Sequence, residues 1–190
     1  MLQVLLEIND RYSLSEMAQM AIEAGCGWIV IGEGISDEEK REHYPGIVEL
    51  CRESGVMLTV TADMDAAKEY GLHGVFLPLG SASPLKVREE LGAEAIIGAE
   101  AGQASVVLEL ERADIDYVSV KPDEKAASII AEVRGAGSNF PIVAYAASAS
   151  LEEAARLKAS GYSGVCCGKE LFEASDPIAC MTQLKEFLMK

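Results

Sequence analysis

The stretch from residue 58 to residue 122 decides the fold of this chain. It reads LTVTAD (58–63), MDAAKEYGLHGVFLPLGS (64–81), SPLKVREELGAEAIIGAEA (83–101) and DYVSVKP (116–122). Short apolar runs alternate here with segments of helical period, and almost every apolar run ends in a small or charged residue. This alternation is typical of βα units whose helices cover both faces of a parallel sheet.

The same alternation extends to both ends of the chain and predicts eight strands. Apolar runs of four to eight residues are read as buried strands, because helical segments are longer and keep a 3.6-residue period. The predicted strands are 3–8, 28–32, 56–61, 74–77, 95–99, 117–120, 142–145 and 164–168.

Start and stop signals for helices lie between these strands. Helix starts are predicted at Ser13 or Ser15, Ser36, Ser83-Pro84, Pro122-Asp123 and Ser150, since serine caps a helix and proline suits its first turn. Left-handed glycine caps are expected to end five helices. These glycines are Gly25, Gly55, Gly71, Gly92 and Gly161.

Eight βα units predict one domain over residues 1–190, a compact (β/α)₈ TIM barrel with short loops. The competing fold is an open doubly wound sheet. That fold carries a glycine-rich fingerprint after its first strand, whereas NDRYS (9–13) stands there in this chain. The closed barrel is therefore the preferred prediction.

Charge and composition exclude several functional classes. Sixteen Lys and Arg residues stand against 31 Asp and Glu, a formal charge of -15, so we expect neither nucleic acid nor an anionic membrane as a partner. The first residues read as a strand and not as a signal peptide, and no apolar run is long enough to cross a bilayer. Five cysteines without metal-ligand spacing indicate a reducing cytoplasm.

The functional face of a (β/α)₈ barrel is at the carboxyl ends of its strands. Alternate strand residues point inward, so strand parity selects the side chains that reach this end. The set contains four carboxylates and two lysines, which we expect at one mouth. Its members are Gln3, Glu7, Glu33, Thr59, Thr61, Asp63, Glu100, Ser119, Lys121, Tyr145 and Lys169.

Lys121 suggests one specific chemistry. A lysine at the end of the sixth strand, desolvated by apolar neighbours, could form a Schiff base with a carbonyl substrate. Glu33 or Glu100 would then act as the acid or base. The structural alternative for Lys121 is a salt-bridged lysine at a strand end.

Several segments resemble the thiamine-phosphate synthase and TenI family of (β/α)₈ barrels. The resemblance is strongest in GLHGVFL (71–77), LKVREELGAEAIIGAEA (85–101) and DYVSVKP (116–122). It continues more weakly through PIVAYAAS (141–148) and GVCCGKELF (164–172). It covers about two thirds of the chain and implies a barrel that acts on thiazole phosphates.

This chain departs from the family where the resemblance implies chemistry. The family's second strand ends in two cationic residues, and Gly32 and Gly34 occupy those positions here. Its third strand ends in an Asn-Asp-Arg triplet, which falls on Thr61-Ala62-Asp63, and a further aspartate falls near Ser81. The resemblance implies Mg²⁺ as a cofactor, but neither magnesium aspartate is retained in register. Asp63 is then read as a loop acid and Asp65 as the cap of the next helix.

The family's phosphate-binding glycine pair falls on Ala146-Ala147, which leaves Ser148, Ser150 and Gly168 as candidate phosphate contacts. The mobile loop that the family carries after its sixth strand is cut short after Lys121-Pro122. The resemblance thus assigns substrate binding to a set of residues at the mouth. They are Thr61, Asp63, Ser81, Ser119, Tyr145, Ala147, Ser148, Gly168 and Lys169.

Histidine and cysteine residues are given structural roles. His43 lies in a polar stretch and His73 precedes the fourth strand, at the end of the barrel away from the mouth. Cys166 and Cys167 are adjacent on a strand, so they face opposite sides and are read as small buried apolar residues.

Three functions stay open on the sequence alone. The first is a divergent member of the family, linked to thiazole phosphate metabolism but without the usual Mg²⁺-dependent synthase reaction. The second is an authentic synthase with shifted site residues, and the third is a Schiff-base aldolase-type lyase using Lys121. The first is preferred, because pyrophosphate entering so acidic a protein without the family's cations meets repulsion. The candidate partners are a small phosphorylated heterocycle and a second copy of the chain.

Overall fold

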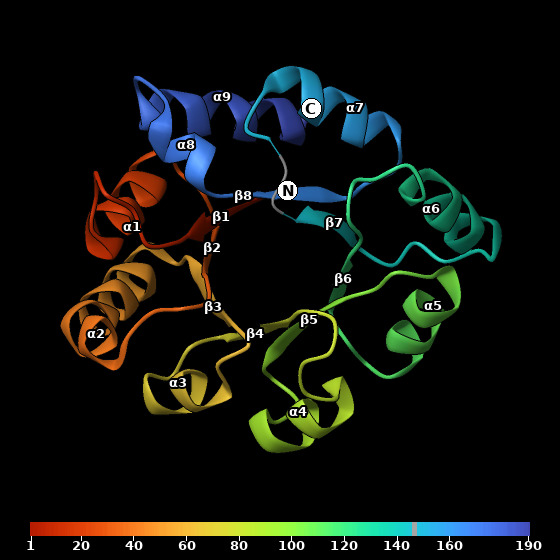
Figure 1. Cartoon of the computed structure of the whole chain (residues 1–190), viewed down its shortest axis with the longest axis horizontal. Coiled ribbons are helices and arrows are strands. Elements are labelled where there is room, and N and C mark those ends of the chain that lie inside the picture. The colour runs from red at the N-terminus through yellow and green to blue at the C-terminus, as the bar shows by residue number, and fades with distance from the viewer. Residues whose placement is uncertain (146–147) are drawn as a thin grey trace.

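A computed structural model describes residues 1–145 and 148–190. Its strands pair in parallel in sequence order, and β8 pairs with β1, so that the sheet closes into a barrel (Figure 1). The predicted (β/α)₈ barrel is confirmed, and the open doubly wound alternative is wrong. The strands are β1 (Leu2–Leu6), β2 (Trp28–Ile31), β3 (Met57–Thr61), β4 (Gly74–Leu77), β5 (Ile96–Glu100), β6 (Tyr117–Ser119), β7 (Ile142–Tyr145) and β8 (Gly164–Cys167).

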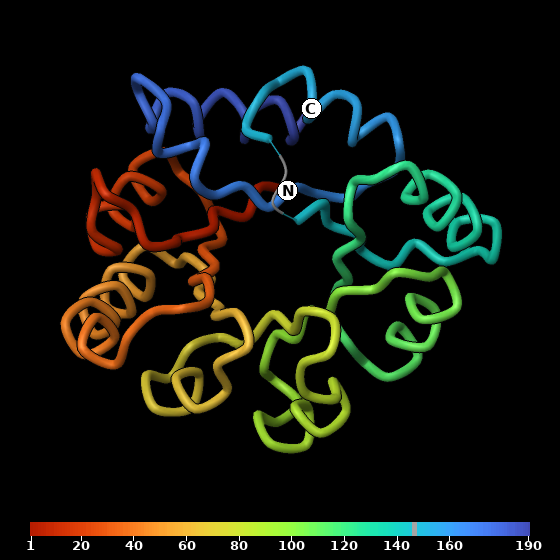
Figure 2. Tube along the Cα trace, in the orientation of Figure 1, coloured from red at the N-terminus to blue at the C-terminus, as the bar shows by residue number. Residues whose placement is uncertain are grey.

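Helices surround the barrel, and each strand is followed by at least one of them (Figure 1). The trace makes one complete turn about the barrel, which brings α1 beside α9 at the end of the chain (Figure 2). The helices are α1 (Leu14–Glu23), α2 (Asp37–Ser54), α3 (Met64–Glu69), α4 (Pro84–Leu91), α5 (Ala104–Arg112), α6 (Ala126–Gly135), α7 (Leu151–Ala159), α8 (Lys169–Glu173) and α9 (Pro177–Met189).

Most of the predicted helix signals are confirmed. Ser13 and Ser36 each accept from the backbone three residues on, while a glutamate at that position reaches back to the cap, so both form a complete capping box. The five predicted glycine stops all have positive φ, between 66° and 92°. These conformations favour glycine because a Cβ atom crowds the left-handed backbone.

Two predicted helix starts are wrong. The helix after β6 begins at Ala126 and not at Pro122-Asp123, because the Asp123 carboxylate accepts from the Lys125 amide and holds a turn first. Asp63, and not Asp65, caps α3 by accepting from the Ala66 amide at 2.9 Å. Asp63 is thus a capping residue in place of a simple loop acid.

The inside of the barrel is filled by aromatic side chains. Tyr117 packs edge-on against Trp28 at a centroid distance of 5.2 Å and is stacked with Phe76 at 6.1 Å. Gly98 makes room for this column, because a Cβ atom there would collide with the Tyr117 ring. The interior of the barrel is therefore a packed core and not a channel.

A second, larger core lies between the barrel and the helices. Cys167 belongs to this outer core and Cys166 to the barrel interior, and both are fully buried. The prediction that these adjacent cysteines are buried on opposite sides of β8 is confirmed. No helix in the described part of the chain is long and apolar enough to cross a membrane.

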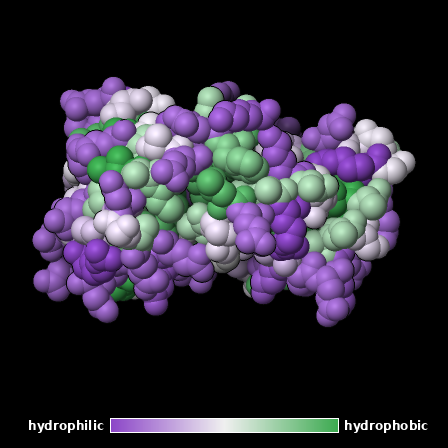
Figure 3. All heavy atoms as spheres, turned by 90° about the horizontal axis from the view of Figure 1, so that it is seen from above, coloured by the Kyte–Doolittle hydropathy of each residue, from purple (hydrophilic) through white to green (hydrophobic). Residues whose placement is uncertain are grey.

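Large exposed apolar side chains are spread over the surface. On the side where α7, α8 and α9 lie, apolar groups are interspersed with hydrophilic ones (Figure 3). The predicted homodimer stays a prediction. The exposed residues are Met1, Ile8, Leu79, Leu85, Leu151 and Met189.

Candidate functional site

Inward-facing residues at the carboxyl ends of the strands form the floor of the mouth. Thr61 and Ser119, on β3 and β6, are only 4% and 1% exposed. Tyr145, on β7, is half-buried and stacks on Phe76 with ring centroids 4.6 Å apart. Strand parity had predicted Thr61, Ser119 and Tyr145 to share this end, and the structure brings them to it. Gln3 and Thr59 lie deeper in the barrel, where Thr59 accepts from the Trp28 indole at 3.0 Å.

A cavity of about 270 Å³ opens beside this floor, between α2 and the ends of β2 and β3. Asp63 and Lys40 form an ion pair at its edge, with Oδ2 and Nζ 2.6 Å apart. Lys40 also lies 3.4 Å from the Asp37 carboxylate. The cavity is lined by Gly32, Glu33, Gly34, Ile35, Lys40, Tyr44, Thr61, Ala62 and Asp63.

Both carboxylate oxygens of Asp63 are held within the fold. Oδ1 accepts from the Ala66 amide and Oδ2 pairs with Lys40. Burial raises the pKa of Asp63, but the hydrogen bonds from Lys40 and Ala66 outweigh burial and hold this pKa below its ordinary value. Asp63 is therefore an anion neutralised by its neighbours.

Tyr44 contributes a buried hydroxyl to the same cavity. It is 1% exposed and packs edge-on against Tyr70, with ring centroids 5.1 Å apart. Its hydroxyl has no hydrogen-bond partner in the part of the chain that the structure describes. Burial and, after it, the charge of Asp63 raise the pKa of Tyr44, so the phenol stays protonated and can donate.

The Thr61 hydroxyl is also without a hydrogen-bond partner among the described residues. It lies close enough to Tyr145 to oppose the rise in the pKa of that residue. Burial first, and then Cys166, raise the pKa of Tyr145, with Glu7 and Glu33 acting in the same direction. Thr61 therefore belongs both to the floor of the mouth and to the lining of the cavity.

A second cavity, of about 340 Å³, lies on the other side of Glu33. Lys169 lines it together with Glu7, and its Nζ lies 3.4 Å from the Glu173 carboxylate one helical turn further on. Glu33 is exposed and lines both cavities. The structure thus brings Glu7, Glu33 and Lys169 together, as the sequence predicted.

Glu100 and Lys121 lie on the opposite side of the mouth, at the ends of β5 and β6. Their carboxylate and ammonium groups are 3.8 Å apart, and Glu100 also accepts from the Leu79 amide at 3.1 Å. The Lys121 side chain is 75% exposed. Lys121 therefore projects into water and lacks the apolar surroundings that the Schiff-base interpretation requires.

Ser81 lies on the exposed turn after β4. Its hydroxyl donates to the Pro78 carbonyl at 2.6 Å, so the side chain is turned toward its own loop. The predicted role of Ser81 in substrate binding stays a prediction, and this hydrogen bond would have to break for the hydroxyl to serve it.

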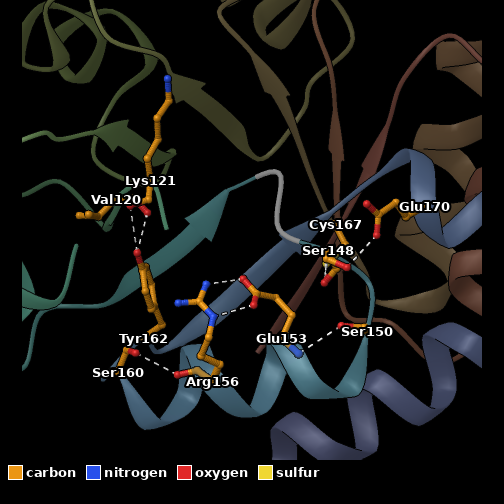
Figure 4. Close-up of polar contacts among 10 residues, drawn as sticks. All are labelled: Val120, Lys121, Ser148, Ser150, Glu153, Arg156, Ser160, Tyr162, Cys167 and Glu170. Atoms are coloured by element: carbon orange, nitrogen blue, oxygen red, sulfur yellow. Dashed lines mark hydrogen bonds and ion pairs between the residues drawn. The ribbon is translucent and has the colours of Figure 1, made fainter. Parts of the chain in front are cut away.

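The loop between β7 and α7 faces a glutamate from α8. Glu170 accepts from the Ser148 hydroxyl at 2.9 Å (Figure 4). It also accepts from the Ala149 amide at 3.1 Å. The Cys167 thiol donates weakly to the Ser148 carbonyl at 3.7 Å. Donor groups of the kind that bind phosphate are therefore occupied by a carboxylate. The predicted contact Ala147 lies outside the described residues.

Gly168 joins β8 to α8 and is buried. A Cβ atom there would lie 3.0 Å from a Glu7 oxygen and 3.3 Å from the Leu5 side chain. The position is thus close to Glu7, and its role in substrate binding stays a prediction.

The two histidines make structural contacts, as predicted. The Leu58 amide donates to His73 Nδ1 at 3.0 Å, and His43 Nδ1 lies 3.0 Å from the Ser15 hydroxyl. Both rings link secondary-structure elements on the outside of the barrel, and neither lines a described cavity of the mouth.

Comparison with known proteins decides the family. The sequence pattern of the family described as thiamine monophosphate synthase matches residues 3–171. This chain belongs to that family. The predicted resemblance to thiamine-phosphate synthases is confirmed, and with it the assignment to a transferase family of thiamine biosynthesis.

Individual members of the thiamine monophosphate synthase family agree with this assignment. A thiamine-phosphate synthase of Phocaeicola vulgatus is 28% identical to this chain, over 94% of this chain and 93% of its own length. The structure of a thiamine phosphate pyrophosphorylase from Pyrococcus furiosus superposes with a TM-score of 0.83 at 20% identity, and covers 99% of this chain and 95% of its own. The barrel fold is therefore that of solved members of the family.

The barrel is also shared outside the family. A 4-hydroxy-2-oxoglutarate aldolase/2-deydro-3-deoxyphosphogluconate aldolase from TTHB1 superposes with a TM-score of 0.75 at 15% identity, over 98% of this chain and 94% of its own. Identity this low shows the fold alone, so aldolase chemistry gains no support from it.

Sequence reasoning missed three residues of this site: Lys40, Tyr44 and Glu170. The first two carried a usable signal, since Lys40, Tyr44, Ile47 and Cys51 follow the spacing of one helix face, and the last three are buried. That face turns toward β2 and β3, which puts Lys40 beside the strand ends. The contact of Glu170 with Ser148 spans 22 residues and has no such local signal.

Proposed function

We propose that this chain is a ligand-binding member of the thiamine monophosphate synthase family that does not carry out the Mg²⁺-dependent synthase reaction. Its ligand would be a small heterocycle of thiazole phosphate metabolism, bound at the mouth of the barrel. The main support for this proposal is that both carboxylate oxygens of Asp63 already have partners. Oδ2 pairs with the Lys40 ammonium, and Oδ1 accepts from the Ala66 amide.

Mg²⁺, the ion that the family resemblance implies, does not fit the residues at this position. It prefers carboxylate oxygens with several waters in near-octahedral geometry. A Mg²⁺ ion at Asp63 would compete with the Lys40 ammonium at Oδ2 or with the Ala66 amide at Oδ1, and the Ser81 hydroxyl already donates to Pro78. Asp63 and Ser81 are therefore not arranged as a Mg²⁺ site.

The charges around the cavity also oppose a pyrophosphate. Gly32 and Gly34 stand where the resemblance implies cations, and Glu33 lies between them in the sequence. Lys40 is the cation at this cavity, and it is neutralised by Asp63 and Asp37. Stabilising the charge of a transferred or leaving pyrophosphate requires positive groups placed for that purpose.

A synthase assay tests the proposal directly. The purified chain is incubated with a pyrimidine pyrophosphate, a thiazole phosphate and Mg²⁺, with the Phocaeicola vulgatus relative assayed in parallel. We expect turnover below about one thousandth of that of the relative, as for loss of a main charge-stabilising group. Turnover within about tenfold of the relative would overturn the proposal and establish an authentic synthase with shifted site residues.

Binding is measured separately, by titrating the thiazole phosphate into the chain without Mg²⁺. We expect weak saturable binding, with a Kd of about 1 mM, because the phosphate must compete with Glu170 for Ser148 and Ala149. An absence of binding at about 10 mM would contradict the predicted phosphorylated ligand and leave an unmodified heterocycle as the ligand class.

A further inference from the structure

The cavity between α2 and the ends of β2 and β3 has features of a built binding site. It has an apolar wall at Ile35 and two buried hydroxyls, Tyr44 and Thr61, that lack hydrogen-bond partners within residues 1–145 and 148–190. A buried polar group without a partner costs free energy, so its presence needs an explanation. A ligand that supplies the missing hydrogen bond is one such explanation.

The charges at the cavity indicate what kind of ligand this is. Lys40 and Asp63 neutralise each other at 2.6 Å, which leaves the Glu33 carboxylate as a negative charge at the opening. Glu33 has no lysine or arginine within 4.0 Å among the residues that the structure describes. A cation placed between Glu33 and the hydroxyls would gain an ion pair that an anion cannot form.

The backbone at the cavity supports the same assignment. Ala62 has φ of 56° although it is not glycine, and its amide is held by the Phe76 carbonyl at 2.8 Å. Such a conformation is unfavourable for a residue with a Cβ atom and persists where the surroundings enforce it, often at ligand sites. Ala62 stands between Thr61 and Asp63, so this conformation sets the relative positions of the two polar residues.

From these observations we infer that the cavity binds a small organic cation, a ring bearing an amine or amidine group. The amine or amidine group would donate to the Glu33 carboxylate and to the hydroxyl oxygens of Tyr44 and Thr61. The ring would lie against Ile35. This site goes beyond the proposed function, in which a thiazole phosphate competes with Glu170 at Ser148 and Ala149, and it rests on the proposed function in one respect: both require that pyrophosphate does not bind in the cavity.

A charge series of similar shape tests the inference. Benzamidinium, benzyl alcohol and benzoate are titrated into the full chain and followed by protein NMR, with the resonances around the cavity as the readout. We expect benzamidinium to bind at least about tenfold more tightly than benzoate, with benzyl alcohol between them. Benzoate binding as tightly as benzamidinium, or no shift with any probe at about 10 mM, would overturn the inference.

Three variants locate the binding. Glu33→Gln should weaken benzamidinium binding about fivefold, whereas Glu38→Gln, an equal charge change on an exposed part of α2, should leave it within about twofold. Equal losses in the two variants would show a general effect of net charge and overturn the site.

Tyr44→Phe separates a ligand-binding hydroxyl from a structural one. Removing a buried hydroxyl that lacks a partner should leave the melting temperature unchanged or higher, while benzamidinium binding weakens about threefold. A lower melting temperature with unchanged binding would assign the hydroxyl to the fold and contradict the inference. Synthase turnover is measured independently, so a cation site that fails and a proposed function that fails give different results.

Discussion

On the β7–β8 side of the mouth, the Ser148 hydroxyl and the Ala149 amide both donate to Glu170. On the β2–β3 side, the hydroxyls of Tyr44 and Thr61 have no hydrogen-bond partner within the described chain, and a cavity lies beside them. One side thus satisfies its polar groups from within the protein, whereas the other leaves them for a ligand. In the same barrel, the loop after β7 has its hydrogen-bond donors paired with Glu170, whereas the cavity at β2 and β3 contains unpaired hydroxyl groups.

The two sides nevertheless share one feature, a carboxylate where the family resemblance implies positive or phosphate-binding groups. Glu170 covers the loop after β7, and Glu33 stands between the two glycines after β2. Each carboxylate disfavours an anion at its own position, because like charges in a partly desolvated site repel strongly. The ligand preference that we propose therefore rests on the whole mouth and not on one substitution.

The largest expected effect comes from removing Asp63, which holds the wall of the open side. Asp63→Ala loses both the α3 cap and the ion pair with Lys40, and we expect it to lower the free energy of unfolding by about 2–3 kcal/mol. Asp63→Asn keeps a capping side chain and should cost only about 1 kcal/mol. Urea denaturation of both variants measures the difference, and equal losses would show that the ion pair and not the cap stabilises this side.

Glu170→Gln tests the β7–β8 side, where Glu170 accepts from Ser148 and Ala149. The amide keeps an acceptor for the Ala149 amide but removes the negative charge, so we expect affinity for inorganic phosphate to rise about fivefold. Isothermal titration with phosphate measures the change. Glu173→Gln is the matched control on the same helix, because Glu173 pairs with Lys169 and is not in contact with Ser148. An unchanged phosphate affinity in Glu170→Gln would show that the charge of Glu170 does not oppose phosphate binding at this loop.

The fold was predictable from the sequence because its signals are local and repeat eight times. Apolar runs, capping serines and terminal glycines each specify an element within a few residues, and their agreement fixes the barrel. One exception, the late start of α6, comes from a side-chain turn at Asp123 that competes with the helix. Strand parity then placed Thr61, Ser119 and Tyr145 at the mouth.

The candidate site was less predictable because its contacts join distant parts of the chain. Asp63 is separated from Lys40 by 23 residues and Ser148 from Glu170 by 22, so neither partner follows from a local pattern. Whether a carboxylate at the mouth is exposed, paired or capping depends on these contacts. The sequence could therefore identify the residues at the mouth, but it could not show which of them are exposed, paired or capping a helix.

The smallest expected effect is the pH dependence of the stability that the charge of Asp63 contributes. The pKa of Asp63 is held below its ordinary value in the folded protein, so its contribution to stability is fully present above the unfolded pKa of about 3.9. That contribution is lost as the pH falls through the folded pKa. The difference in unfolding free energy between the parent and Asp63→Asn should therefore be constant from pH 7 to about pH 5 and shrink toward pH 3.

Other carboxylates make the comparison with Asp63→Asn necessary. Hydrogen bonds from Ser13, Ser36 and Arg156 also lower the pKa values of Glu16, Glu39 and Glu153 respectively, so the whole protein loses stability in acid. These groups are unchanged in Asp63→Asn, and their effect cancels in the difference. If this difference in unfolding free energy stays constant down to pH 3, the charge of Asp63 does not stabilise the folded protein. Asp63 would then stabilise it only by capping α3.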